Sequence, residues 1–176
     1  MAGAADDLPL PAFDEAPRLL LVVAPYHEAV TDALVSGARA TLERAGARHE
    51  TIEVPGALEI PIAIRIASGR DYDGFVALGC VIRGETTHYD TVCNDSSRAL
   101  MLLGLQGACI GNGILTVETE EQARVRAEDQ DKGGGAAAAA LHLVALTRRM
   151  ARRGRDVGFR PGEFMLARGG EATAER

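Results

Sequence analysis

The sequence predicts an α/β domain in which a parallel sheet lies between two layers of helices. Strand-like apolar segments alternate with helical segments four times along the chain, which is the pattern of such folds. Two apolar segments, residues 18–24 and 73–82, are continuous runs, as expected of strands that are covered on both faces. The chain has 176 residues, of which 47% are hydrophobic, so its length and composition suit one domain with a full core.

The first three segments predict a strand, a helix and a second strand. Residues 18–24, RLLLVVA, form the first strand. Apolar or small residues then recur at helical spacing over residues 29–45, and Gly46 follows where glycine commonly ends a helix. Residues 48–54 alternate enough to predict a second strand, which the following Pro-Gly pair stops.

The segment LEIPIAIRIA, residues 58–67, has two interpretations. Its β-branched content favours a strand, but Pro61 suits only an edge strand or the first turn of a helix. We predict a helix that starts around Glu59. Residues 73–82 then form the third strand, and residues 88–106 have the apolar spacing of another helix.

The remaining segments complete the alternation. Residues 108–117 predict the fourth strand, and residues 119–127 a short helix whose early acids and late arginines match the helix dipole. A long helix follows over residues 132–153, after a glycine-rich entry. Four strands with connections of this length favour a flavodoxin-like three-layer α/β/α sandwich with a four-stranded parallel sheet, in which ligands bind beyond the carboxyl ends of the strands.

The two ends of the chain differ from the domain, residues 17–154. Residues 1–16 contain two prolines and four acidic residues, and a third proline follows at position 17, which predicts a flexible N-terminal tail. Residues 155–176 form a C-terminal extension. This extension either packs across a subunit boundary or is a loose tail. The apolar residues that would pack are Phe159, Phe164 and Met165.

Charge and composition exclude several functional classes. The net charge of −6 argues against a general affinity for nucleic acid or anionic membranes, and the apolar runs are too short to span a bilayer. The arginines of residues 148–155 complement the end of a helix rather than form a nucleic-acid surface. Residues 1–17 do not have the pattern of a secretory signal. The three cysteines (Cys80, Cys93 and Cys109) lack the spacing of a metal site, and we expect the protein to function in the reducing cytoplasm.

Polar and aromatic residues follow the strands at the ends where ligands are expected. Tyr26 and His27 come after the first strand, Glu59 after the second, and Glu85 and His88 after the third. Because the carboxyl ends of parallel strands meet at one edge of the sheet, these side chains should lie close together.

The stretch RGETTHYD, residues 83–90, is the strongest single candidate for a site. Gly84 lets the backbone approach a ligand closely, and the amides near Thr86 precede a helix, where a phosphate binds well. His88 is within proton-transfer reach of such a ligand. Elsewhere, GNGILT departs from the dinucleotide fingerprint, and neither a P-loop nor a nucleophile elbow occurs.

Four stretches, taken together and in this order, resemble the lumazine synthase family. They are VPGALEIPIA, ALGCVIRGETTHYDTVCNDSSRAL, GNGILTVETEEQARVRA and DKGG, and the resemblance covers roughly residues 18–150. It implies the condensation of 5-amino-6-(D-ribitylamino)uracil with 3,4-dihydroxy-2-butanone 4-phosphate to 6,7-dimethyl-8-ribityllumazine, in riboflavin biosynthesis. It also implies no metal or organic cofactor, and a homopentamer with active sites between subunits, which in some members assembles further into decamers or a 60-subunit shell.

The resemblance also implies roles for individual residues. Tyr26 would stack on the aminouracil, Glu59 would bind ribityl hydroxyls, and His88 would transfer protons. The full set implied for the aminouracil is Tyr26, Ala57, Leu58, Glu59, Cys80, Val81, Ile82 and Asn112. The set implied for the butanone phosphate is Glu85, Thr86 and, from the neighbouring subunit, Arg126, with Lys132 as a second basic residue near that site. His27 replaces a frequent asparagine and Asn112 a frequent phenylalanine, which puts the packing around the ring in doubt.

Two other classes of function compete with this one. A non-catalytic flavodoxin-like module would bind lumazine or flavin without turnover, so that substituting His88 and Arg126 would leave its affinity largely intact. A structural shell protein would form a large particle with an empty site, which light scattering would detect.

Overall fold

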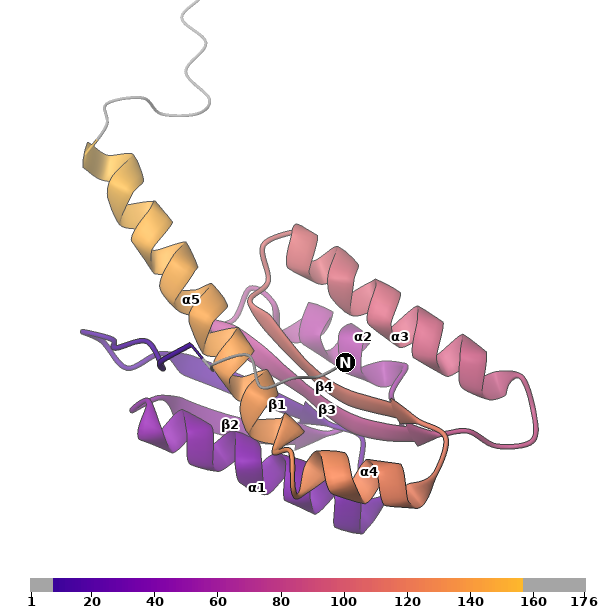
Figure 1. Cartoon of the computed structure of the whole chain (residues 1–176). Coiled ribbons are helices and arrows are strands. Elements are labelled where there is room, and N and C mark those ends of the chain that lie inside the picture. Colours follow the sequence, from indigo (N-terminus) through magenta and orange to yellow (C-terminus); the bar gives the residue numbers. More distant parts are fainter. Residues whose placement is uncertain (1–7, 157–176) are drawn as a thin grey trace, which may run out of the picture.

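The computed structural model describes residues 8–156 and contains a four-stranded, all-parallel sheet (Figure 1). The strand order is β2-β1-β3-β4. The strands are β1 (Arg18–Val23), β2 (Arg48–Glu53), β3 (Gly74–Ile82) and β4 (Ile110–Val117). The helices are α1 (Glu28–Arg44), α2 (Glu59–Ala67), α3 (His88–Leu105), α4 (Glu120–Ala127) and α5 (Lys132–Asp156). This architecture confirms the predicted three-layer α/β/α fold.

The helices cover the two faces of the sheet in separate layers (Figure 1). Helices α1, α4 and α5 pack on one face, with Leu21 of β1 in their core. Helices α2 and α3 pack on the other face, where Leu20 and Val22 point. Both central strands are therefore buried on two sides, which explains their continuous apolar sequences.

Most element boundaries agree with the prediction, including the helix of residues 59–67. Pro61 lies in the first turn of α2, where its missing N–H costs no intrahelical bond. Gly46 has a φ of +67° just after α1, as expected of a glycine that ends a helix. Strand β4 starts at Ile110, two residues later than predicted, and Thr119 caps α4 by accepting a bond from Gln122 N at 3.2 Å.

Glycines let α5 pack unusually close to α1 and β4. A Cβ on Gly133 would overlap with the backbone carbonyl of Leu34 in α1, and one on Gly111 in β4 would overlap with that of Ala136 in α5. Asp131, at a φ of +42°, precedes α5, and its Oδ1 accepts a bond from Gly134 N at 2.9 Å. The glycine- and alanine-rich start of α5 is thus a requirement of packing.

The amino-terminal ends of the strands carry a polar network, at the edge of the sheet opposite to the strand ends that the sequence identified as a site. The Arg18 guanidinium pairs with Glu50, whose Oε2 accepts a bond from Tyr72 Oη at 2.8 Å. The hydrogen bond from Arg18 lowers the pKa of Glu50, and the bond to Glu50 raises the pKa of Tyr72. These groups connect β1, β2 and the segment before β3, and they lie away from the predicted site.

Residues 8–16, part of the predicted flexible tail, lie against the domain. Leu10 and Phe13 pack on the core of the α1–α5 layer, and Arg148 of α5 donates to Glu15 O at 2.7 Å. The prediction did not anticipate these contacts. Residues 1–7 of that tail and the predicted packing residues Phe159, Phe164 and Met165 lie outside the described residues.

No helix in the described range is long and apolar enough to cross a membrane.

Candidate active site

A cavity of about 530 Å³ opens at the carboxyl ends of β1, β2 and β3. Its walls come from the segments that follow these three strands and from the first turns of α2 and α3. Most of the residues that the sequence predicted for a site line it. They are Tyr26, His27, Ala57, Leu58, Glu59, Cys80, Val81, Ile82, Thr86 and His88.

Four predicted residues lie outside this cavity. Asn112 is exposed on the edge strand β4, where its Oδ1 accepts a bond from Ile114 N at 3.0 Å. Glu85 is exposed in the loop after β3. Arg126 lies on α4 and Lys132 begins α5, both in the helix layer on the other face of the sheet from α2 and α3. One chain thus brings together the predicted aminouracil residues except Asn112, together with Thr86 and His88.

The segment after β1 presents an aromatic ring to solvent. Tyr26 is 80% exposed, and its ring meets the His27 ring edge-on, with centroids 5.2 Å apart. The carbonyl of His27 accepts bonds from Thr31 N at 2.9 Å and from Thr31 Oγ1 at 2.8 Å, which fixes the start of α1. An exposed ring on a fixed backbone suits stacking against a planar ligand.

The segment after β2 holds a carboxylate at a helix start. Glu59 is the first residue of α2, where the helix dipole favours a negative charge. A Cβ on Gly56 would lie only 3.0 Å from Glu59 Oε2, so a glycine here leaves room for the carboxylate. Glu59 N also donates to Gly56 O at 3.1 Å, which closes the turn.

The end of β3 contributes a thiol and backbone groups. Cys80 is buried, and burial raises the pKa of its thiol to about 11. At neutral pH the group is therefore protonated and is a poor nucleophile. Its neighbours Val81 and Ile82 are half-buried and also line the cavity.

The raised pKa predicts how Cys80 reacts with iodoacetamide. Because only the thiolate is alkylated, the labelling rate should rise about tenfold per pH unit between pH 7 and pH 9.5 without a plateau. Peptide mass spectrometry would measure this rate beside that of a free model thiol, which levels off near its ordinary pKa of about 8.5. A plateau for Cys80 below pH 9 would contradict the assignment.

The loop after β3 carries Gly84, Thr86 and His88 into the cavity. His88 is the first residue of α3, and its N–H donates to Thr86 Oγ1 at 3.4 Å. Apart from its two chain neighbours, no described residue has an atom within 4 Å of a Cβ built on Gly84, so the backbone there is open to a ligand.

Several lining residues were not named as site residues from the sequence, among them Tyr89 and Val92 of α3. Both side chains are half-buried. The available signal was their spacing. Tyr89 and Val92 lie three residues apart on the helix that begins at His88, and residues at this spacing share a face.

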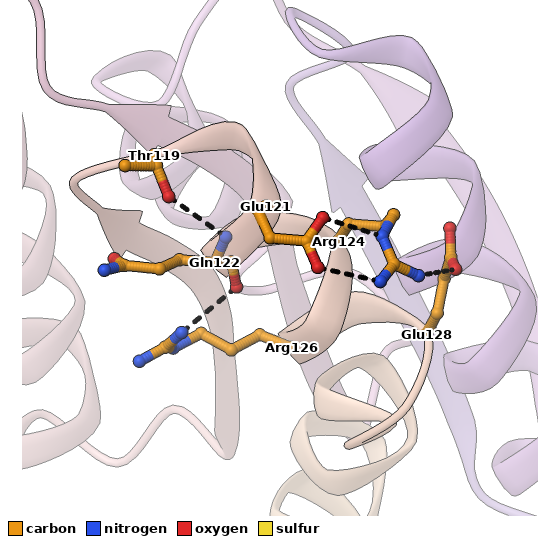
Figure 2. A network of polar contacts seen from close by, with 6 residues as sticks. All are labelled: Thr119, Glu121, Gln122, Arg124, Arg126 and Glu128. Carbon is orange, nitrogen blue, oxygen red and sulfur yellow. Dashed lines mark hydrogen bonds and ion pairs between the residues drawn. The ribbon is translucent and has the colours of Figure 1, made fainter.

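Two arginines of α4 have different surroundings (Figure 2). Arg124 pairs with Glu121 at 2.9 Å and with Glu128 at 3.0 Å, and the hydrogen bond to Glu121 is the main cause of its raised pKa. Arg126 donates to the carbonyl of Gln122 at 3.1 Å and has no carboxylate partner within residues 8–156. Arg126 is thus the arginine of this helix whose charge is available to an external anion.

Among residues 8–156, no cluster of three or more histidine, cysteine or acidic side chains has the arrangement of a metal site.

The chain is similar to proteins of one family over most of its length. Residues 16–148 match the family model described as 6,7-dimethyl-8-ribityllumazine synthase. A protein of that name from Jannaschia sp. (strain CCS1) is 55% identical over 174 residues, which is 96% of this chain and 98% of the relative. One from Agrobacterium fabrum is 55% identical over 143 residues, which is 76% of this chain and 97% of the relative.

Proposed function

The chain belongs to the 6,7-dimethyl-8-ribityllumazine synthase family, an enzyme family of riboflavin biosynthesis, and from this premise we propose its reaction. It condenses 5-amino-6-(D-ribitylamino)uracil with 3,4-dihydroxy-2-butanone 4-phosphate, releasing phosphate and water. The observation that carries the proposal is the cavity itself. It combines an exposed aromatic ring, the main chain of a strand end, and a loop with Gly84, Thr86 and His88. The reaction takes place in the cytoplasm and uses no cofactor.

The aminouracil occupies the part of the cavity between β1, β2 and β3. The Tyr26 ring stacks on the pyrimidine, and the main chain of residues 80–82 bonds to its polar edge. Glu59 accepts bonds from ribityl hydroxyls, next to the main chain of Ala57 and Leu58. The main chain of residues 80–82 is already held by its pairing with β4, which reduces the entropy lost on binding.

The butanone phosphate occupies the loop after β3. The amides of residues 85 and 86 and the Thr86 hydroxyl donate to the phosphate at the start of α3. The Glu85 carboxylate points away from it. Arg126, and with it Lys132, comes from the neighbouring subunit and completes the anion site.

The reaction needs little beyond orientation and proton transfer. The aminouracil amine attacks the ketone and expels water to form an imine, phosphate then leaves, and the enol tautomerises before the ring closes with loss of a second water. His88 moves protons between these intermediates. Holding two reactants in a single orientation supplies a large effective molarity. The protonated Cys80 thiol fits a route without a covalent enzyme intermediate.

The first test follows the lumazine chromophore in a mixture of purified protein and both substrates. A saturable rate above that of an enzyme-free mixture is expected, because the reactants condense slowly unaided. Background rate together with tight aminouracil binding would instead identify a binding module, and background rate with neither binding nor turnover would favour a structural role.

The site is shared between subunits of a homopentamer, and this can be tested by complementation. His88→Ala and Arg126→Ala chains are each expected to be nearly inactive alone. After unfolding and refolding together in equal amounts, about a quarter of the sites would combine a wild-type His88 with a neighbour's wild-type Arg126. Recovery of activity to that level supports the shared site. No recovery in mixed pentamers contradicts it.

A further inference from the structure

Arg83 makes side-chain contacts to two other segments around the cavity. Its Nε donates to Glu118 Oε2 at 2.8 Å, and its Nη2 donates to Asp90 Oδ1 at 3.3 Å. The guanidinium carbon lies 4.1 Å from the centroid of the Tyr89 ring. Its own N–H donates to Val117 O at 2.9 Å, so the backbone of Arg83 is fixed as well. A planar guanidinium can make both the ion pairs and the stack, which an ammonium cannot.

These contacts bridge the loop that carries the proposed phosphate and proton-transfer groups. Arg83 stands at the entry of the loop, and Tyr89 and Asp90 stand at its exit, in the first turn of α3. Glu118 stands at the end of β4 and is itself held, because its N–H donates to Gln122 Oε1 at 3.0 Å. The Arg83 side chain thus joins both ends of the loop to the β4–α4 connection.

The loop between these anchors has few other restraints. Residues 84–88 are all exposed, and the polar contact of Thr86 is the long bond from His88 N, at 3.4 Å. Arg83 itself is outside the set of residues that line the cavity, whereas Tyr89 belongs to it. Because Arg83 does not line the cavity, we expect its side chain to act on catalysis through the geometry of the loop rather than by contact with a substrate.

We propose that Arg83 is a positioning residue, whose bridge from Glu118 to Tyr89 and Asp90 holds Gly84, Thr86 and His88 in the geometry that binds and turns over the phosphorylated substrate. The inference rests on the proposed function, because it assigns the loop to that substrate. The side chain of Arg83 is 40% exposed, and ion pairs at such positions contribute little to global stability. The effect of Arg83 should therefore appear in the loop rather than in the free energy of unfolding.

The test compares two variants. Arg83→Met keeps most of the side-chain length but removes the positive charge and the planar guanidinium, whereas Arg83→Lys keeps the charge. The control is Arg98→Met, because within residues 8–156 the side chain of Arg98 makes only an exposed pair with Asp95, at 3.8 Å on α3. Arg83→Met is expected to lower kcat/KM by about 10- to 100-fold, since small misplacements of reacting groups have effects of this size. The KM for the butanone phosphate should rise more than that for the aminouracil, with Arg83→Lys intermediate and Arg98→Met unchanged.

Hydrogen exchange provides a second readout that does not depend on turnover. The amides of residues 84–88 should exchange faster in Arg83→Met than in the wild type, while those of β3 stay protected. If Arg83→Met fails to fold, Glu118→Gln serves instead, because it weakens the bridge at a residue outside the cavity. Unchanged loop exchange would overturn the proposal, whatever the kinetics. An inactive wild-type protein would refute the proposed function instead, and loop exchange would still decide the positioning role.

Discussion

Arg126→Ala is expected to lower kcat/KM by about 10²- to 10³-fold, the range typical for the loss of one charged or hydrogen-bonding group that stabilises a developing anion. The departing phosphate gains charge as its bond to carbon breaks, and Arg126 is the arginine of α4 that has no carboxylate partner within the described residues. Much of the loss should fall on kcat, with an additional rise in the KM for the butanone phosphate.

Arg124→Ala is the matched control, because Arg124 lies two residues away on the same helix and already pairs with Glu121 and Glu128 (Figure 2). It should keep nearly full activity. Steady-state kinetics with an enzyme-free reference would measure both variants, and sedimentation would check that both keep the wild-type assembly. Equal losses in the two variants would show that α4 acts through its total charge and would contradict the assignment to Arg126.

Gly133→Ala is expected to destabilise the protein by about 3 kcal/mol or more, at the upper end for added volume in a packed interior. The new methyl group would overlap with the Leu34 carbonyl, which is backbone of α1 and cannot rotate away. For a chain of this size such a loss corresponds to a fall in Tm of roughly 6 to 12 °C.

Gly135→Ala offers a control in the same turn of the same helix. Gly135 is exposed, and apart from the adjoining backbone of α5 no described residue has an atom within 4 Å of a Cβ built there. Alanine at this site should stabilise the helix by about 0.5–1 kcal/mol. Urea unfolding at one fixed protein concentration would measure both variants. Similar midpoints for the two would mean that α1 and α5 can move apart without cost, contrary to the packing described here.

The fold was predictable because its signals are local. Each central strand is a continuous apolar run, and Pro61 and Gly46 occupy positions where only a few backbone conformations are allowed. The cavity was predictable for a related reason. Residues that follow parallel strands meet at one sheet edge, so the sequence order of Tyr26, Glu59 and His88 already implied their proximity.

Contacts between distant residues were not predictable from the sequence. The bond between Arg83 and Glu118 joins residues 35 positions apart, and no periodicity relates them. The glycines of GNG and KGGG signal a close approach of backbones, but not which backbone approaches. Likewise, Leu10 and Phe13 lie in a segment whose prolines and acids predicted flexibility, and only the folded core reveals the surface on which they pack.

The close contact of α5 with α1 and β4 has an evolutionary consequence. Any missense mutation of a glycine codon adds a side chain. At Gly111 and Gly133 even the smallest side chain would overlap with the backbone of a neighbouring helix, so no single substitution there is conservative. A family descended from this chain should therefore drift freely over the exposed face of α5 while these positions stay invariant. Change there would require a compensating shift of a whole helix, which single substitutions rarely provide. Gly111 and Gly133 are thus expected to be among the slowest positions of the chain to evolve.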